Sequence, residues 1–268
     1  MRAWTLGSGS KGNSILLESE GTRVLIDAGY SPRALKQRLA AVHVAPESIS
    51  AVIVTHEHID HMRGVRAAQR RWKWHVYGSA GTIGAIKELD ESRTTSLRSS
   101  APFTIGALQF ELVRVPHDAT APTAVVATAT SSGFRAGIAH DLGAVPEKLR
   151  IAFERLDLLL LESNHDEEML RTGPYPAFLQ ARISGGSGHL SNRKSAAFTR
   201  ELAGAQLRQL VLLHLSEANN TPEYAVHAAQ AALRSAKVKC PVTAAPQDRA
   251  AGPFGDAKGG VRQLALAL

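Results

Sequence analysis

The chain has 268 residues, of which 44% are hydrophobic, 21% charged and 5% aromatic, which is the composition of a soluble globular protein with a substantial core. No apolar run approaches the roughly 18 residues that span a bilayer, and the single Cys240 excludes an internal disulfide. The formal charge of +7 favours a polyanionic partner such as nucleic acid, although plain solubility explains it equally well.

The N-terminal stretch MRAWTLGSGSKGN has one early Arg and no apolar segment long enough for a secretory signal. We therefore expect a cytoplasmic protein with no membrane segment. The sequence leaves the oligomeric state open, with a homodimer as one option.

Short apolar runs ended by Gly, Ser or charged residues predict strands, and the pattern alternates with helical spacing along the chain. The first predicted helix begins at Ser31-Pro32, which suit the N-cap and first helical positions. Strands are predicted over residues 3–6, 15–18, 24–27, 51–55, 74–77, 103–105, 108–115, 123–129, 134–139, 158–161 and 210–213, and further helices over 63–71, 79–89, 145–154, 191–203 and 222–236.

This order of elements suits two sheets packed face to face, with helices on the outside. We assign residues 1–245 to one domain. Residues 246–268 contain Gly, Pro, Asp and Lys with little apolar content before a short apolar end, and we expect them to form a loose tail.

Residues 54–61 read VTHEHIDH and place His56, His58, Asp60 and His61 directly behind a predicted strand. His56 and His58 are two residues apart and can point the same way from an extended segment, whereas Asp60 and His61 are adjacent and must point differently. The motif therefore divides into two ligand pairs, which could serve two metal ions. Imidazole with carboxylate suits Zn²⁺, Mn²⁺ or Fe better than Ca²⁺ or Mg²⁺.

Three later apolar runs also close on an ionisable residue, where a core position has no reason to carry one. FELVRVPHD ends at His117, FRAGIAHDLG at Asp141 and LRQLVLLHLS at His214. A satisfied turn residue explains any one of them alone. Their combination with the HEHIDH motif favours a shared metal site.

The HEHIDH segment fits the H-x-H-x-D-H motif, and the chain here resembles the metallo-β-lactamase-fold hydrolases. The resemblance implies an α/β fold, a four-layer αββα sandwich with a dinuclear metal site along one edge. It implies that His56, His58 and His117 bind one ion, that Asp60, His61 and His214 bind the other, and that Asp141 bridges them. Two Zn²⁺ ions are preferred, with Mn²⁺ or Fe as alternatives. Asp27 in LIDAG matches a family residue that orients ligand imidazoles, or it only closes a turn before Gly29.

The stretch from 184 to 216, SGGSGHLSNRKSAAFTRELAGAQLRQLVLLHLS, resembles the nuclease branch of this family, in which a G-H-[LMS]-[ST] segment supplies a histidine that is not a ligand. His189 fits that role and would stabilise or protonate the leaving oxygen, or it only stands at the entry to the following helix. Asp60 would serve catalysis as well as ligation. The segments GSGSKGNS, LIDAG, ESNHDEEML, GPYPAFLQARISGGSGHLSN and LLHLSEANNTPE are similar to the YycJ/WalJ-type subgroup. That similarity implies a nuclease acting on DNA, with 5′→3′ exonuclease activity.

Several polar residues near these motifs are candidate substrate contacts, each with a plainer alternative. Ser10 and Asn13 lie in a Gly-rich loop that can present N–H groups to a phosphate or simply form a tight turn. Asn164, His165 and Asn192 stand near predicted helix starts and could contact a phosphate or only cap a helix. Arg63 begins a series with Arg66 and Arg70 on one helical face, which could follow a nucleic-acid backbone or only be solvated.

Two rival functions stay open, and the effect of one departure from the family pattern is also undecided. The first rival is a small-molecule metallo-hydrolase of the same fold, such as a cyclic phosphodiesterase, lactonase or thioesterase; the second is a non-catalytic nucleic-acid-binding protein. His140 precedes Asp141 where a small or hydroxylated residue is more usual, and it could disturb the surroundings of the ligands or face away.

Overall fold

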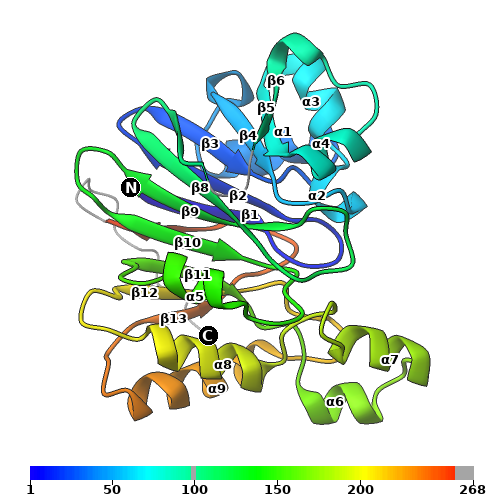
Figure 1. Ribbon diagram of the computed structural model, residues 1–268, viewed down its shortest axis with the longest axis vertical. Coiled ribbons are helices and arrows are strands. Elements are labelled where there is room, and N and C mark those ends of the chain that lie inside the picture. The colour runs from blue at the N-terminus through cyan, green and yellow to red at the C-terminus, as the bar shows by residue number, and fades with distance from the viewer. Residues whose placement is uncertain (98–100, 257–268) are drawn as a thin grey trace.

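The computed structural model describes residues 1–97 and 101–256, and in this part of the chain two mixed sheets pack face to face between layers of helices (Figure 1). The first sheet has the order β14 (Ala251–Gly255), β1 (Arg2–Gly7), β2 (Ser14–Ser19), β3 (Thr22–Ile26), β4 (Ala51–Val54), β5 (His75–Ser79) and β6 (Thr94–Leu97). The second has the order β13 (Val242–Ala244), β12 (Gln209–Leu213), β11 (Leu158–Glu162), β10 (Arg135–Ala139), β9 (Thr123–Ala129), β8 (Leu108–Arg114) and β7 (Phe103–Ile105). The predicted αββα sandwich is confirmed.

The helices cover both outer faces of the sandwich. The first sheet is covered by α1 (Pro32–Ala41), α2 (Ile59–Met62), α3 (Val65–Trp72) and α4 (Ala80–Ala85), and the second by α5 (Glu147–Ala152), α8 (Asn192–Leu202) and α9 (Pro222–Ser235). The short helices α6 (Glu167–Thr172) and α7 (Ala177–Ser184) stand apart at one end of the second layer (Figure 1). Two 3₁₀ turns, Pro46–Ser48 and Glu91–Arg93, complete the described elements.

Alternating side chains along the strands build three apolar layers. In β2, Ile15 and Leu17 enter the core between the sheets, whereas Leu16 packs under the helices that cover the first sheet. In β11, Leu160 enters the central core and Leu161 packs under the helices of the second sheet. Strands that are buried on both faces therefore appear in the sequence as continuous apolar runs. The alternation of apolar and polar residues that marks a half-exposed strand is weak in them.

Some predicted boundaries differ from the structure. The predicted helix over 63–71 corresponds to α3, and the separate short helix α2 precedes it, with Arg63 and Gly64 between the two. The short strands β6 and β13 and the helices α6 and α7 were not predicted, because elements of three to eight residues carry little periodic signal.

The expectation of a loose tail from residue 246 is wrong for residues 251–255. This AGPFG segment forms β14, which pairs antiparallel with β1, and Phe254 is buried in the core between the sheets. Burial of one aromatic side chain outweighs the preference of Gly and Pro for loops. Residues 257–268 of the predicted tail lie outside the described residues.

None of the helices within residues 1–97 and 101–256 is both long enough and apolar enough to cross a membrane.

Candidate metal centre

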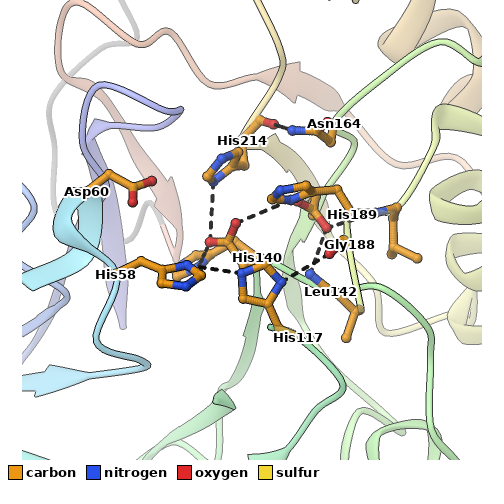
Figure 2. A network of polar contacts seen from close by, with 12 residues as sticks. His58, Asp60, His117, His140, Leu142, Asn164, Gly188, His189 and His214 are labelled. Atoms are coloured by element: carbon orange, nitrogen blue, oxygen red, sulfur yellow. Dashed lines mark hydrogen bonds and ion pairs between the residues drawn. The ribbon is translucent and has the colours of Figure 1, made fainter. Parts of the chain in front are cut away.

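The predicted ligands meet where strands of both sheets end at one edge of the sandwich. His56 follows β4 in the first sheet, and His117, Asp141 and His214 follow β8, β10 and β12 in the second. Strands β10, β11 and β12 are parallel, so their carboxyl ends share an edge. Asp60 approaches the same space from α2, opposite His214 (Figure 2).

Three of the site residues turn the chain sharply at a strand end. Asp27, Asp141 and His214 have φ angles of 62°, 55° and 53°. The left-handed region is uncommon for residues with a side chain, although Asp and His enter it more readily than most. It costs on the order of 1–3 kcal/mol per residue and concentrates at functional sites. The fold therefore bears a conformational cost where these side chains leave the sheet.

His56, His58 and His117 form the first cluster. Their ring centroids lie 4.7 to 5.1 Å apart, with rings nearly perpendicular. Nδ1 of His117 lies 3.1 Å from the Gly188 carbonyl and donates to it, which leaves Nε2 facing His58 at 3.3 Å from its Nδ1. The three nitrogens converge closely enough to hold one metal ion.

Asp60, His61 and His214 form the second cluster. Oδ2 of Asp60 lies 3.3 Å from Nε2 of His61, and the rings of His61 and His214 are parallel with centroids 6.0 Å apart. One donor atom from each residue lies within 4.8 Å of the others. This second group could hold another ion beside the first.

Asp141 lies between the two clusters. Its Oδ2 is 2.7 Å from Nε2 of His61, 3.4 Å from Nδ1 of His214 and 4.0 Å from Nε2 of His56. The carboxylate is almost completely buried. A single anionic group thus faces nitrogens of both clusters, as a bridging ligand must.

The charges of the site suit a cation. Burial lowers the pKa of His56 well below its usual range, and burial also lowers the pKa of His214. For Asp141, burial alone would raise the pKa, but His214 and His61 hold it well below its usual range. His56 and His214 therefore offer neutral imidazoles and Asp141 offers an ionised carboxylate, which are the protonation states that ligate metals.

Buried polar atoms without hydrogen bonds support the same conclusion. Nε2 of His56 and Nδ1 of His214 have no hydrogen-bond partner, although both are inaccessible to solvent. Buried polar atoms are normally paired, and coordination of a metal ion is one explanation for exceptions. These histidine and aspartate clusters fit divalent metal ions.

Asp27 supports the second cluster from behind. Its Oδ2 lies 2.7 Å from Nδ1 of His61, while its two oxygens also accept bonds from the backbone N–H and hydroxyl of Thr55 at 2.8 Å. Burial opposes a charge on His61, yet Asp141 and Asp27 raise its pKa well above the usual value. Asp27 therefore fixes the ring through Nδ1 and leaves Nε2 for the site.

His140 does not face away from the site. It is buried, with Nε2 3.3 Å from Asp27 Oδ2 and Nδ1 3.4 Å from Asp141 Oδ2. Its ring lies 4.8 Å from that of His61. The departure from the family pattern thus places one more imidazole among the groups that support the ligands (Figure 2).

His189 stands on the opposite wall, held by Glu162. Its Nδ1 lies 2.7 Å from Oε1 of Glu162, and Oε2 of Glu162 accepts the backbone N–H groups of Leu142 and Leu190 at 2.9 and 3.0 Å. Burial opposes the charge of His189, but Glu162 raises its pKa to about 9. A protonated imidazole is thereby fixed beside the pocket.

Gly188 explains why the segment before His189 needs glycine. A Cβ at this position would lie 2.2 Å from the carbonyl oxygens of Arg182 and Ile183. Only a residue without a side chain allows this close approach. The Gly188 carbonyl oxygen accepts the hydrogen bond from Nδ1 of His117, so the glycine helps to place a predicted ligand.

The clusters open into a pocket of about 230 Å³ lined by Ser10, His58, Asp60, His117, Asp118, Asp141, Leu179, Arg182, Ile183, Gly188, His189 and His214. One wall is α7, which contributes Leu179, Arg182 and Ile183. Arg182 forms an ion pair with Asp118 at 2.5 Å, and this pair joins α7 to the loop that carries His117. One side of the pocket is therefore formed by α7, a helix in which no residue is buried.

Of the predicted substrate contacts, only Ser10 lines this pocket. Asn13 is buried, with Nδ2 3.2 Å from Asp60 Oδ2 and 3.0 Å from His61 Nε2. Asn164 donates to the His214 carbonyl at 2.9 Å, and Asn192 bonds to Ser163 and Asn220. These hydrogen bonds position the loops of the site, and a substrate contact by any of the three amides stays a prediction.

His165 and Arg63 lie near other surfaces. His165 is buried below a second cleft on the far side of α7, and burial lowers its pKa to about 4. Arg63 is exposed beside α2 and lines a groove with Arg66 and Lys87. Neither residue reaches the pocket that holds the clusters.

Three residues of the site were not identified from the sequence: Glu162, Asp118 and Arg182. Glu162 closes the apolar run LLLLE, the same signal that identified His117 and Asp141, and could have been found by it. The pairing of Asp118 with Arg182 joins residues 64 positions apart and leaves no local pattern.

Comparisons with known proteins show the family of the chain. A family model described as "Beta-lactamase superfamily domain" matches residues 22–215. The exodeoxyribonuclease WalJ of Streptococcus pneumoniae serotype 2 is 34% identical over 226 residues, which cover 82% of this chain and 83% of that protein. The exodeoxyribonuclease YycJ of Bacillus anthracis is 29% identical over 224 residues, covering 82% and 84%.

A solved structure shares the fold at low identity. The metallo-beta-lactamase fold protein YhfI of Bacillus subtilis superposes with a TM-score of 0.71 at 19% identity, covering 93% of this chain and 97% of that one.

Proposed function

We propose, from the premise that this chain belongs to the beta-lactamase superfamily, that it is a metal-dependent exodeoxyribonuclease that releases nucleotides from a 5′ end. Similarity to two exodeoxyribonucleases along most of the chain supports the substrate class. The arrangement of two donor clusters around Asp141, with His189 on the facing wall, carries the proposal.

The donor set assigns a ligand role to seven residues. His56, His58 and His117 would hold one ion, Asp60, His61 and His214 the other, and Asp141 would contact both. The mixture of imidazole and carboxylate favours Zn²⁺, with Mn²⁺ or Fe as alternatives. Two such ions, when bound, would supply positive charge beside a phosphodiester and would make water at the site more acidic.

The protein's own groups prepare the rest of the reaction. Glu162 accepts a hydrogen bond from Nδ1 of His189 and so stabilises the protonated ring. Nε2 is the nitrogen of His189 that is left to face the substrate. An imidazolium at this point can protonate the leaving oxygen as the P–O bond breaks. Arg182 and Asp118 form an ion pair that lines the neighbouring wall of the pocket.

End-labelled single-stranded and duplex DNA, incubated with protein loaded with Zn²⁺ or Mn²⁺, tests the proposal. Wild type should release nucleotides from the 5′ end, and Asp141→Asn and His189→Ala should lower the rate by at least about 100-fold. Rapid turnover of a thioester, a lactone or a cyclic phosphodiester, with DNA left intact, would instead assign a small-molecule hydrolase. Tight binding of DNA without cleavage by fully loaded protein would assign a binding protein.

A further inference from the structure

We propose that Phe178 on α7 is the stacking surface for a nucleobase next to the phosphodiester being cleaved, an inference that rests on the proposed nuclease function. Phe178 is the N-terminal aromatic residue of α7 and its side chain is 76% exposed. At this exposure the ring contributes little to the stability of the fold, since a side chain left in water gains little from the hydrophobic effect.

The size of the pocket requires the bases to lie outside it. At about 230 Å³ it is smaller than the roughly 300–1,000 Å³ of pockets that enclose a drug-sized ligand. Its lining is mostly His, Asp and Arg, which suits a phosphate group. A strand whose phosphate enters this space must leave its neighbouring bases at the rim.

The position of Phe178 on α7 places it at that rim. Leu179, the residue after Phe178, lines the pocket, and so does Arg182, which is four residues after Phe178. Residues four apart share a helix face, about 6 Å apart along the axis. Phe178 therefore stands one turn beyond Arg182, outside the pocket and on the helix that forms its wall.

Two exposed large apolar side chains lie next to the pocket in the sequence. Within the described ranges the exposed ones are Ile59, Ile151, Phe178 and Tyr224. Ile59 lies between His58 and Asp60, and Phe178 precedes Leu179, so two of the four adjoin pocket-lining residues. Phe178 alone of these two offers an aromatic face, and aromatic faces stack on bases without regard to sequence.

The charge on the far side of α7 fits the backbone of the same strand. A second cleft of about 550 Å³ lies there, and its lining includes Arg171, Arg193 and Lys194. Arg171 pairs with Glu168, Arg193 pairs with Glu167, and Lys194 donates to the Ser184 carbonyl. Helix α7 contributes to both cavities and separates them. A DNA strand that leaves the pocket and crosses α7 with a base on Phe178 would reach these cationic groups. Cationic side chains attract the phosphates of the DNA backbone.

Steady-state kinetics on single-stranded DNA test the role of this ring. Phe178→Ala should raise KM about 5- to 150-fold, the range measured for loss of one base–aromatic stack, while Phe178→Trp should restore it. Tyr224→Ala removes an exposed aromatic on α9, 54% exposed, and should leave KM unchanged. Elemental analysis of each variant should show the wild-type metal content.

Oligonucleotides with one abasic site identify the contact itself. When the abasic site replaces the stacked base, Phe178→Ala and wild type should have the same KM, and at other positions the difference should persist. An unchanged KM in Phe178→Ala, a difference that no abasic position removes, or a dimer that the substitution dissociates in sedimentation would overturn the inference. Wild-type protein that is loaded with metal and leaves DNA intact would overturn the proposed function, and this inference with it.

Discussion

The carboxylate of Glu162 lies 2.7 Å from Nδ1 of His189, and it also accepts the N–H groups of Leu142 and Leu190. It is completely buried, and it joins the loop after β10 to the segment that carries His189. Although burial alone would raise the pKa of Glu162, the charge of His189 lowers it. The pair therefore keeps a carboxylate and an imidazolium together beside the pocket.

Glu162→Gln should shift the alkaline limb of the pH–activity profile toward acid. The raised pKa of His189, about 9, means that a reaction needing its proton is supported below that pH and fails above it. Without the charge of Glu162, the limb should move toward the ordinary histidine value of about 6.5. The measurement is kcat/KM between pH 6 and 10 at saturating metal. Glu167→Gln, which removes a nearby surface carboxylate, serves as the control, and coincident profiles would contradict the pairing.

Metal binding should release a proton from His61. Burial opposes its charge, but Asp141 and Asp27 raise its pKa well above 6.5, so the metal-free site holds a proton at neutral pH. Metal affinity should then rise with pH, by up to about tenfold per unit below this pKa, because the ligand must be deprotonated. Calorimetric titration in two buffers of different ionisation enthalpy counts the protons. A binding enthalpy that is the same in both buffers would show that none is released.

Asp27→Asn should weaken metal binding without preventing folding. Asn tolerates the left-handed backbone at this position and can still bond to Thr55, but it lacks the charge that holds Nδ1 of His61. Loss of such an outer partner costs about 10- to 100-fold in metal affinity. Competition against a chromogenic chelator gives the affinity, and far-UV circular dichroism checks the fold. Wild-type affinity in the variant would remove Asp27 from the support of the site.

The sequence identified groups whose signal is local. His56, His117, Asp141 and His214 each follow an apolar run, and an ionisable side chain there is conspicuous without any knowledge of the fold. The two sheets also followed from alternation of short strands with turns.

Residues whose role depends on a distant partner could not be found in the same way. Asn13 and Asn164 look like loop residues free to meet a substrate, but their burial is decided by packing against Asp60 and His214. Arg182 acquires its place from Asp118, which is remote in the chain. Phe254 forms part of the core only because β14 reaches β1 across the whole sequence.

The basic face beside α2 and α3 should determine the salt dependence of DNA binding. Arg63, Arg66 and Arg70 are exposed there, and Arg66 pairs with Glu88. If each neutralises one phosphate, the slope of log affinity against log salt falls by about 0.7 per residue on single strands. Changing all three to Ala should therefore reduce the slope by up to about 2. The control changes Arg200 and Arg234 on α8 and α9 in the opposite helical layer (Figure 1). An unchanged slope would show that DNA follows another surface.

Phe254→Ala should destabilise the protein while leaving its chemistry intact. Phe254 is 5% exposed in the core between the sheets, far along the chain from the metal clusters. Truncating a buried Phe costs about 3–5 kcal/mol, which corresponds to a fall in Tm of about 6–20 °C for a domain of this size. Ile151→Ala, at a side chain 59% exposed, should change Tm little. Activity at 20 °C should equal that of wild type, because β14 contributes no residue to the pocket. Equal Tm values for Phe254→Ala and wild type would mean that β14 does not belong to the stable sheet.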